Sequence, residues 1–316
     1  MRAFCAFPTG LFVVDGESVE ERLTDVSPSC VTTAAETVVC GTSDAGIWRS
    51  ADGGGRFERV DGDALESTHV TALAAGPDGT WWAGTEPSAL YRSDDDGRTW
   101  RATPTPVTTL ASSDEWSFPP RPHTHHVRWI QPRPDDGDAL ALAIEAGALV
   151  RTRDGGETWI DRVDGGPFDT HTMAAHAAAP DRVYAAAGDG YYETADWGVT
   201  WETPEDGLDR TYCWSVAVAP ADPEVRVLTA ASGPRAAHGR GGAAVFRREA
   251  DTPWTRVAAF DPDGLLAPVL AASGERTIHA LSNRGLYRSS DGGETWERVA
   301  LADAPAERPT GIALAD

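Results

Sequence analysis

The stretch Leu286–Trp296 reads LYRSSDGGETW, and closely similar stretches occur four more times along the chain. They read IWRSADGG at 47–54, LYRSDDDGRTW at 90–100, LVRTRDGGETW at 149–159 and YYETADWGVTW at 191–201. The shared pattern is Ser/Thr-x-Asp-x-Gly-x-Thr-Trp, and residues 245–257 form a sixth, eroded copy without the Asp-x-Gly. Five clear copies of one motif at intervals of tens of residues indicate a repeat protein.

Each copy has the chemistry of a tight turn between two strands. An apolar strand ends, and the Asp and Ser/Thr side chains then accept hydrogen bonds from backbone N–H groups. Glycine adopts the backbone conformation that other residues avoid, and the Trp begins the return strand and packs inward. We therefore expect a structural role for the motif carboxylates, which are Asp52, Asp95, Asp154, Asp196 and Asp291.

This pattern resembles the Asp-box, or bacterial neuraminidase repeat, of sialidase-like β-propellers. The resemblance extends over nearly the whole chain, because the copies run from residue 47 to residue 296. It implies an all-β fold in which each repeat is a blade of four antiparallel strands around a central channel.

The spacing of the aromatic residue that closes each copy gives the number of blades. From Phe57 to Trp296 the steps are 43, 59, 42, 53 and 42 residues, close to the ~40–45 residues of a propeller blade. Six blades are then complete, and two short apolar stretches upstream of each box supply their first two strands. We name the four strands of a blade A to D, from the inner to the outer.

The two chain ends together supply a seventh blade. Residues 3–23 contain three strand-like stretches, and the missing inner strand matches residues 310–315. Pairing the C-terminal strand with the N-terminal strands closes the ring and leaves no free sheet edge. A six-bladed ring with frayed ends is the alternative. One domain over 1–316 follows, with blade 1 from 1–25 plus 307–316 and blades 2 to 7 at about 28–61, 69–103, 124–163, 170–204, 212–257 and 265–299.

The composition excludes several classes of partner. The 316 residues include 49 acidic and 27 basic side chains, no lysine is present, and the formal net charge is −22. Such a chain repels nucleic acid and anionic membranes. The lysine-free, Asp-rich balance resembles proteins of halophiles. No apolar run approaches the ~20 residues of a membrane span, and we see no secretory signal at the N-terminus.

The four cysteines point to a reducing compartment. Cys5, Cys30, Cys40 and Cys213 contain no C-x-x-C pair, so neither a zinc knuckle nor a redox motif is indicated. We expect buried thiols in a cytoplasmic, monomeric protein.

Two insertions mark one mouth of the channel. They lie at residues 104–123, between strands D and A, and at about 232–242, between strands B and C. In a propeller these two kinds of loop line the same mouth, whereas the Asp-box turns lie at the other. Long loops in a compact domain are usually functional or disordered, so the insertions favour a lid over a pocket; plain surface variation is the alternative.

The candidate site residues are those that the blade alignment brings to this mouth. His126, His171, Tyr212 and Glu145 are the candidates for acid–base catalysis. The candidates for ligand binding are His125, Arg128, Asp169, Arg235, His238 and Arg284. No cofactor is identified, and a divalent metal ion is one option. Neighbouring His125 and His126 point to opposite faces of a strand and cannot chelate together, so the ion would need His126 or His125 with His171, and Glu145 is a further candidate ligand.

Two classes of function stay open. The first is a propeller whose His/Arg/acid-lined mouth binds a small ligand or a protein partner, and the second is a hydrolase or lyase acting on a sugar or small acid, with or without a metal. A true sialidase is not expected. Sialidases of this family carry a Phe/Tyr-Arg-Ile-Pro motif near the N-terminus, where this chain has Arg2-Ala3-Phe4-Cys5. Arg128, Arg235, Arg284 and Arg308 could serve as mouth arginines, but nothing in the sequence fixes their order.

Overall fold

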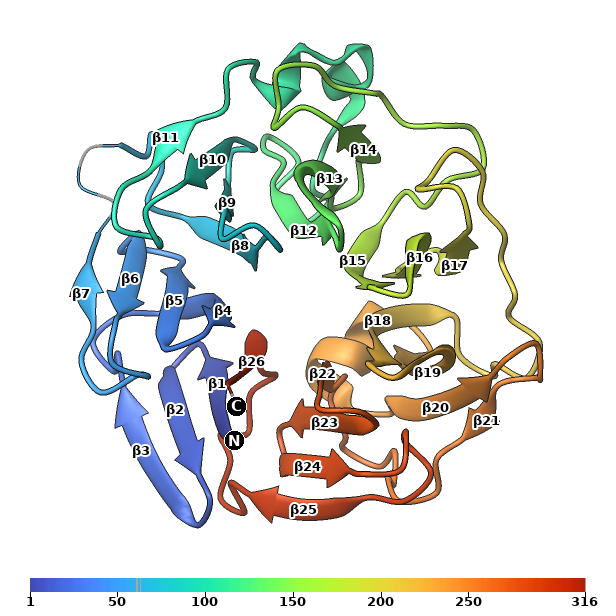
Figure 1. The fold of residues 1–316 in the computed structure, drawn as a ribbon. Coiled ribbons are helices and arrows are strands. Elements are labelled where there is room, and N and C mark those ends of the chain that lie inside the picture. The colour runs from blue at the N-terminus through green and yellow to red at the C-terminus, as the bar shows by residue number, and fades with distance from the viewer. Residues whose placement is uncertain (61, 63, 316) are drawn as a thin grey trace.

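The computed structural model describes residues 1–60, 62 and 64–315. The predicted end of the second blade, residue 61, and the last residue of the closing segment, 316, lie outside the described residues. The chain forms a ring of seven antiparallel sheets around a central channel, with both termini in the same blade (Figure 1). The prediction of a seven-bladed β-propeller is confirmed.

The strands of each blade run from the channel outward. The inner, A strands are β26 (Gly311–Ala315), β4 (Pro28–Ala34), β8 (Val70–Ala75), β12 (Val127–Arg133), β15 (Thr170–His176), β18 (Tyr212–Ala219) and β22 (Val269–Ser273). The B strands are β1 (Arg2–Phe7), β5 (Thr37–Thr42), β9 (Trp81–Thr85), β13 (Asp136–Ile144), β16 (Ala179–Ala187), β19 (Asp222–Ala231) and β23 (Thr277–Ser282). The C strands are β2 (Gly10–Asp15), β6 (Ile47–Ser50), β10 (Leu90–Ser93), β14 (Ala148–Thr152), β17 (Gly190–Thr194), β20 (Ala244–Glu249) and β24 (Gly285–Ser289).

The outer strands are short, and two blades differ from the predicted four strands. The D strands are β3 (Ser18–Arg22), β7 (Glu58–Arg59), β11 (Arg101–Ala102), β21 (Thr255–Arg256) and β25 (Glu297–Ala300). In blades 4 and 5 the outer strand is reduced to one β-bridge, Arg151 with Ile160 and Glu193 with Glu202. A blade edge at the periphery of the ring can shorten in this way because its inner three strands carry the packing.

The ring is closed by the C-terminal strand. β26 pairs antiparallel with β1, from Arg2 opposite Ala315 to Ala6 opposite Gly311. Its other side faces β4 of the next blade, where the Thr33 hydroxyl donates to the carbonyl of Leu314 at 2.8 Å. The first blade is therefore built from both ends of the chain, as predicted.

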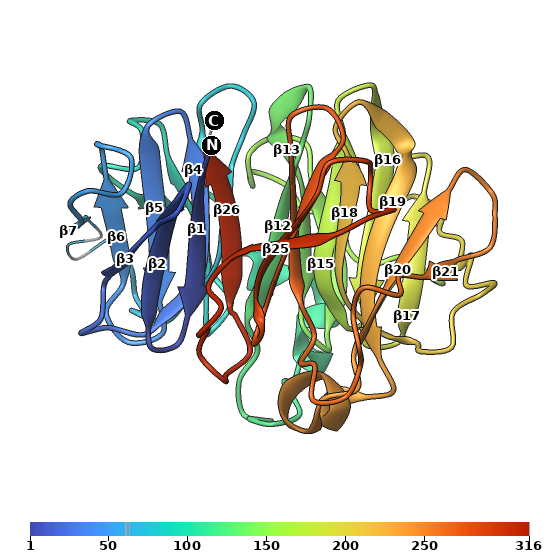
Figure 2. The ribbon, with the colours of Figure 1, turned by 90° about the horizontal axis from the view of Figure 1, so that it is seen from below.

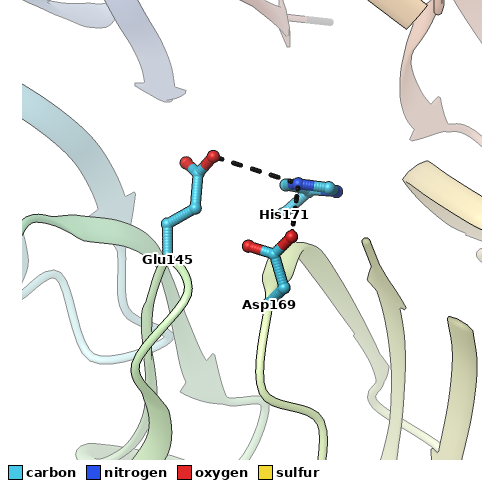
Figure 3. A group of neighbouring side chains, drawn as sticks. All are labelled: Glu145, Asp169 and His171. Atoms are coloured by element: carbon cyan, nitrogen blue, oxygen red, sulfur yellow. Dashed lines mark ion pairs between the residues drawn. The ribbon is translucent and has the colours of Figure 1, made fainter. Parts of the chain in front are cut away.

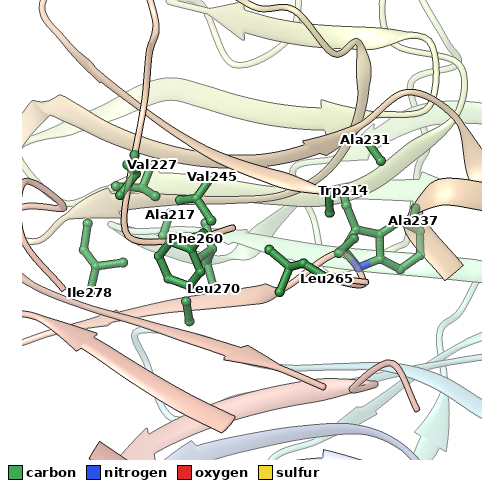
Figure 4. Packing of buried hydrophobic residues seen from close by; sticks show 14 residues of the cluster. Trp214, Ala217, Val227, Ala231, Ala237, Val245, Phe260, Leu265, Leu270 and Ile278 are labelled. Atoms are coloured by element: carbon green, nitrogen blue, oxygen red, sulfur yellow. The ribbon is translucent and has the colours of Figure 1, made fainter. Parts of the chain in front are cut away.

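The hydrophobic core is divided into seven clusters, each between two neighbouring blades. In the cluster between blades 6 and 7, Trp214 and Val227 from one sheet pack against Leu270 and Ile278 from the next (Figure 4). Tryptophans of the motif contribute to this packing; Trp100, for example, is buried between blades 2 and 3. Each blade is thus held by its neighbours on both sides, which makes closure of the ring important for stability.

All five Asp-box turns have one hydrogen-bond pattern. In the second copy, the Ser93 hydroxyl bonds Asp95 at 2.8 Å and accepts the Gly97 N–H at 3.0 Å, while the Asp95 carboxylate accepts the Thr99 N–H at 2.8 Å. Hydrogen bonds of the same kind surround the other four aspartates.

Both insertions contain short helices, and the coil of the second one, in orange, projects from one face of the ring (Figure 2). The first contains η1 (Val107–Thr109) and η2 (Ala111–Glu115), and the second contains η3 (Ala236–Arg240). None of the helices among the described residues has the length and hydrophobicity needed to cross a bilayer.

Candidate functional site

On the face with the two insertions, the channel widens into a cavity of about 610 Å³. Its walls come from the first residues of the inner strands, from the loops that precede them and from the loops between strands B and C. This volume suits a small organic molecule.

A repeated irregularity directs side chains toward this cavity. Five inner strands have a register shift of the β-bulge type near their first residue, at the positions Ser29, Thr71, Arg128, His171 and Trp214. A bulge re-aims a side chain that regular pleating would send elsewhere. Four of these residues line the cavity, and His171 contacts the carboxylates at its wall.

Glu145, in the turn between β13 and β14, is the centre of a charged cluster. Its Oε2 atom lies 2.9 Å from Nε2 of His126 and 3.1 Å from Nε of Arg128. Burial alone would raise the pKa of Glu145, but the hydrogen bond from His126 and the charge of Arg128 outweigh it and lower the pKa to about 2. Glu145 is therefore ionised at neutral pH.

His171 is fully buried, and a neighbouring blade fixes its orientation. Its Nδ1 atom lies 2.7 Å from the carbonyl oxygen of Cys213 in β18. Because a carbonyl only accepts hydrogen bonds, Nδ1 carries the proton and Nε2 has a free lone pair. Burial lowers the pKa of His171 to about 3, so the ring is neutral at pH 7. Nε2 faces Asp169 Oδ2 at 3.8 Å and Glu145 Oε1 at 3.9 Å (Figure 3).

Tyr212 lies between two imidazoles. Its hydroxyl is 3.3 Å from Nε2 of His171 and 3.2 Å from Nε2 of His238, which belongs to η3. Burial and then the charge of Arg308 lower the pKa of His238 to about 4. The tautomer of His171 makes Tyr212 the donor to that ring, so the hydroxyl oxygen can accept from His238. This arrangement is a continuous hydrogen-bonded chain at the cavity wall.

Asp169, just before β15, has the opposite electrostatic environment to Glu145. Burial, followed by the charges of Glu145 and Asp189, raises its pKa to about 6. Its Oδ1 atom accepts the N–H of Ala146 at 3.0 Å, which fixes the carboxylate in place. Two neighbouring carboxylates with separated pKa values are a common feature of functional sites.

Two arginines stack on one tryptophan at the cavity wall. The guanidinium carbon of Arg308 lies 4.2 Å from the ring centroid of Trp214, and that of Arg128 lies 4.9 Å from it. Burial and then the charge of Arg128 lower the pKa of Arg308 to about 10, which leaves it charged at pH 7. Within residues 1–60, 62 and 64–315, no carboxylate pairs with Arg308, and its hydrogen bond is a long one, 3.4 Å, to the carbonyl of Pro309.

The first insertion forms part of the cavity wall. The ring of Phe118 contacts the imidazole of His126 edge-on, with centroids 4.7 Å apart, and Arg121 stacks on Phe118 at 4.8 Å. Arg121 also forms an ion pair with Glu86 of the β9–β10 loop. The wall is otherwise apolar at this point, because Pro119 and Pro120 line it.

Three predicted ligand-binding residues do not reach the cavity. His125 points away from His126, because neighbours on an extended chain alternate, and packs against Trp116 with ring centroids 5.6 Å apart. Arg235 is exposed beside a separate outer hollow. Arg284 donates to the carbonyl of Asp261 at 2.9 Å, outside the cavity. The other predicted residues, which are His126, Arg128, Glu145, Asp169, His171, Tyr212 and His238, come together there.

The metal-ligating pair suggested by the sequence also changes. His126 contacts Oε2 of Glu145, whereas His171 faces the other oxygen, Oε1. The ligand atoms that converge belong to Glu145, Asp169 and His171. The sequence indicated Arg308 as one of four possible mouth arginines, but it gave no role to Trp214 and did not predict that Arg308 stacks on it. The position of both residues in their blades could have indicated this contact, since both lie near the start of an inner strand, as His126 and His171 do.

Comparison with known proteins identifies the repeat and the fold. Residues 287–298 match the model of the BNR/Asp-box repeat. No curated protein sequence matches the chain. Among solved structures, an ancestral GH74 enzyme superposes with a TM-score of 0.65 at 15% identity, over 94% of this chain and 40% of that protein. The GH74 xyloglucanase from Xanthomonas campestris gives 0.64 at 17% identity, over 95% and 47% respectively.

A third similar structure is that of YCF48 bound to a D1 peptide, with a TM-score of 0.62 and 17% identity over 96% of this chain and 85% of that one. The chain spans less than half the length of the GH74 enzymes that it matches. At these identities the similarity concerns the fold. The same propeller therefore occurs in glycoside hydrolases and in a peptide-bound protein.

Proposed function

We propose that the cavity binds a small molecule through a carboxylate or a similar anionic group. The observation that carries this proposal is the Arg308 guanidinium, which is stacked on Trp214 and forms no direct ion pair with a carboxylate among the described residues. A largely buried cation without a direct ion-pair partner is unfavourable, since its pKa is lowered in spite of the more distant charge of Glu145. An anionic ligand would supply the missing partner. Arg128 lies beside it on the same indole ring.

The remaining wall defines the rest of the ligand. Phe118 and several prolines, among them Pro8, Pro28 and Pro234, offer apolar surface, while Tyr212 and His238 offer hydrogen bonds. A ligand with an acidic group and a ring-shaped body, such as an acidic sugar or an aromatic acid, matches these surfaces. The terminal carboxylate of a peptide belongs to the same chemical class.

Calorimetric titration with matched pairs of ligands tests this proposal. Acidic sugars, aromatic carboxylic acids and a short peptide are compared with their neutral amides. We expect binding by members of the acidic set, and Arg308→Gln should weaken it about 10–100-fold, since a charge-assisted hydrogen bond contributes about 1.5–3 kcal/mol. Arg235→Gln, on the same face but outside the cavity, is the control and should leave affinity unchanged. Equal binding of acids and amides would contradict the proposal.

An enzyme of the hydrolase or lyase class is the second candidate. The specific observation is the hydrogen-bonded chain through Tyr212, which places a hydroxyl between the Nε2 atoms of His171 and His238 at the wall of the ligand cavity. Such a chain can deliver or accept a proton at a bound substrate. Tyr212→Phe should then abolish turnover of an acidic oligosaccharide, followed as reducing ends or as a new conjugated double bond. Ligand affinity should fall by no more than about tenfold, the effect of losing one hydrogen bond between neutral groups.

A further inference from the structure

Three hydrogen-bond acceptors converge at one point of the cavity wall. They are Oε1 of Glu145, Oδ2 of Asp169 and Nε2 of His171, and all lie within 4.8 Å of one another (Figure 3). They come from two neighbouring blades: Glu145 from the β13–β14 turn of blade 4, and the other two from the start of β15 in blade 5. Such close acceptors repel one another unless a cation lies between them.

The second oxygen of each carboxylate is already occupied. Oε2 of Glu145 takes the contacts with His126 and Arg128, and Oδ1 of Asp169 accepts the N–H of Ala146. These contacts orient both carboxylates, so that the free oxygen of each faces the imidazole of His171. Outer contacts of this kind orient the ligands in metal sites.

His171 presents the lone pair that a metal ion requires. The bond from Nδ1 to the carbonyl of Cys213 fixes the tautomer and the ring plane, as backbone carbonyls do for metal-bound histidines. The one donor near Nε2 among the described residues is the Tyr212 hydroxyl, at 3.3 Å, which is long for an O–H donor. Tyr212 can give up this contact and keep its contact with His238.

Room for the Asp169 carboxylate comes from a glycine in the β16–β17 loop. A Cβ atom at Gly188 would lie 2.1 Å from Oδ2 of Asp169, so any other residue there would displace the carboxylate. The N–H of Gly188 also donates to the carbonyl of Asp169 at 2.8 Å. The backbone thus holds Asp169 beside His171.

We propose that Glu145, Asp169 and His171 form a binding site for one divalent transition-metal ion of the manganese or zinc class. Bonds of about 2.1 Å to a shared ion place ligand atoms at most about 4.2 Å apart. The two distances from Nε2 of His171, 3.8 and 3.9 Å, satisfy this limit, and a small rotation of the carboxylates brings the third pair within it. Two carboxylate oxygens with one imidazole suit these ions.

Three protein ligands leave further coordination positions open toward the cavity. Open positions are typical of sites at which a ligand or substrate also binds the metal, whereas structural sites are closed. The metal proposal does not depend on anion binding at Arg308, because the three metal ligands are side chains of this chain and no organic anion is needed to bind the ion. The two are distinguished by titrating metal in the absence of any organic acid.

The test uses the full chain, stripped with a chelator and passed through a desalting column. Mn²⁺ and, separately, Zn²⁺ are titrated by calorimetry, and bound metal is counted by elemental analysis. We expect one ion per chain and a rise in Tm of about 4 °C at a hundredfold excess over Kd. Asp169→Asn keeps the acceptor for Ala146 but removes the charged ligand oxygen, so it should weaken binding at least tenfold.

Two further variants complete the test. Glu145→Gln should reproduce the loss, which covers the case in which Asp169→Asn does not fold. Asp164→Asn is the matched control, since Asp164 is an exposed acidic side chain five residues before Asp169 and has no atom in the group of three. It should retain full binding. The absence of saturable binding by either ion, or binding that both ligand variants retain, overturns the proposal.

Discussion

Glu86 and Arg121 form a two-pronged ion pair, with Nε of Arg121 2.8 Å from Oε1 and Nη2 2.5 Å from Oε2. The pair joins the β9–β10 loop to the first insertion, so the long loop is held to the wall of the cavity rather than left free over it. The carboxylate side chain is only 7% exposed, although that of Arg121 is 46% exposed. Arg121 is thus the outer part of a clamp whose inner part is buried.

We expect Arg121→Ala to release the loop over residues 104–123. Loss of a hydrogen-bonded charge pair of this kind removes about 1.4 kcal/mol from the closed state, which raises the open population about tenfold. Limited proteolysis within the loop should accelerate by the same factor. Arg162→Ala breaks a more exposed pair with Glu115 at the outer side of this loop and should change the rate less. Equal rates for the two variants would contradict the clamp.

Deletion of residues 309–316 should destroy the cooperative fold. The deletion removes β26 and exposes the edge of β1, which is then free to pair with other chains. We expect aggregation or a broad, non-cooperative thermal transition.

Transfer of residues 309–316 to a position before Met1, joined by a short turn, is the control for this deletion. The end of β26 lies beside the start of β1, since Ala315 pairs with Arg2, so the transferred strand can take its old place. Solubility and Tm should then recover. A soluble, equally stable deletion variant would show that the ring does not need this strand.

Acid should unfold the protein through its Asp-box turns. Burial acts to raise the pKa of Asp95, but hydrogen bonds from Thr99 and Ser93 outweigh it and lower the pKa to about 2, against about 3.9 in an unfolded chain. The stabilisation from such a group is complete above the unfolded pKa and is lost as the pH falls through the folded one. Tm should therefore fall steeply between about pH 4 and pH 2.

The variant Asp95→Asn measures this contribution at one turn. It loses a charged acceptor of several hydrogen bonds, so we expect a loss of about 1–2 kcal/mol at pH 7 and a shallower dependence on acid. Asp25→Asn, at an exposed position outside the motif, should leave both unchanged. If Tm of Asp95→Asn depends on pH in the same way as Tm of the unmodified protein, this turn does not contribute to unfolding by acid.

Salt should stabilise the protein. With a net charge of −22, the carboxylates repel one another, and the screening length falls from about 10 Å at 0.1 M to about 3 Å at 1 M salt. Tm measured by calorimetry should rise steadily in KCl over this range. Sucrose at equal osmolality is the control, because it is excluded from the protein surface but does not screen charges. A rise in Tm in sucrose as large as that in KCl would contradict the role of charge repulsion.

The sequence by itself determined the architecture. The Asp-box copies have a local chemistry, because a Ser or Thr, an Asp and a Gly within a few residues make their own turn, as around Ser289 and Asp291. Repetition of that turn at a blade-sized interval sets the number of blades, and the unmatched strands at the two ends predict the closure between β26 and β1. Alternation along the strand also separates His125 from His126.

Only the tertiary structure decided which side chains meet. The bulges at Arg128, His171 and Trp214 have no sequence signature, because a register shift arises from the fit between one strand and its partner. Arg308 reaches Trp214 only because the ring closes. Arg284 lies at a position in its blade that was also expected to face the cavity, but its guanidinium donates to the carbonyl of Asp261 instead. Side-chain direction across blades depends on bulges, rotamers and ring curvature, which no spacing of residues along the chain encodes.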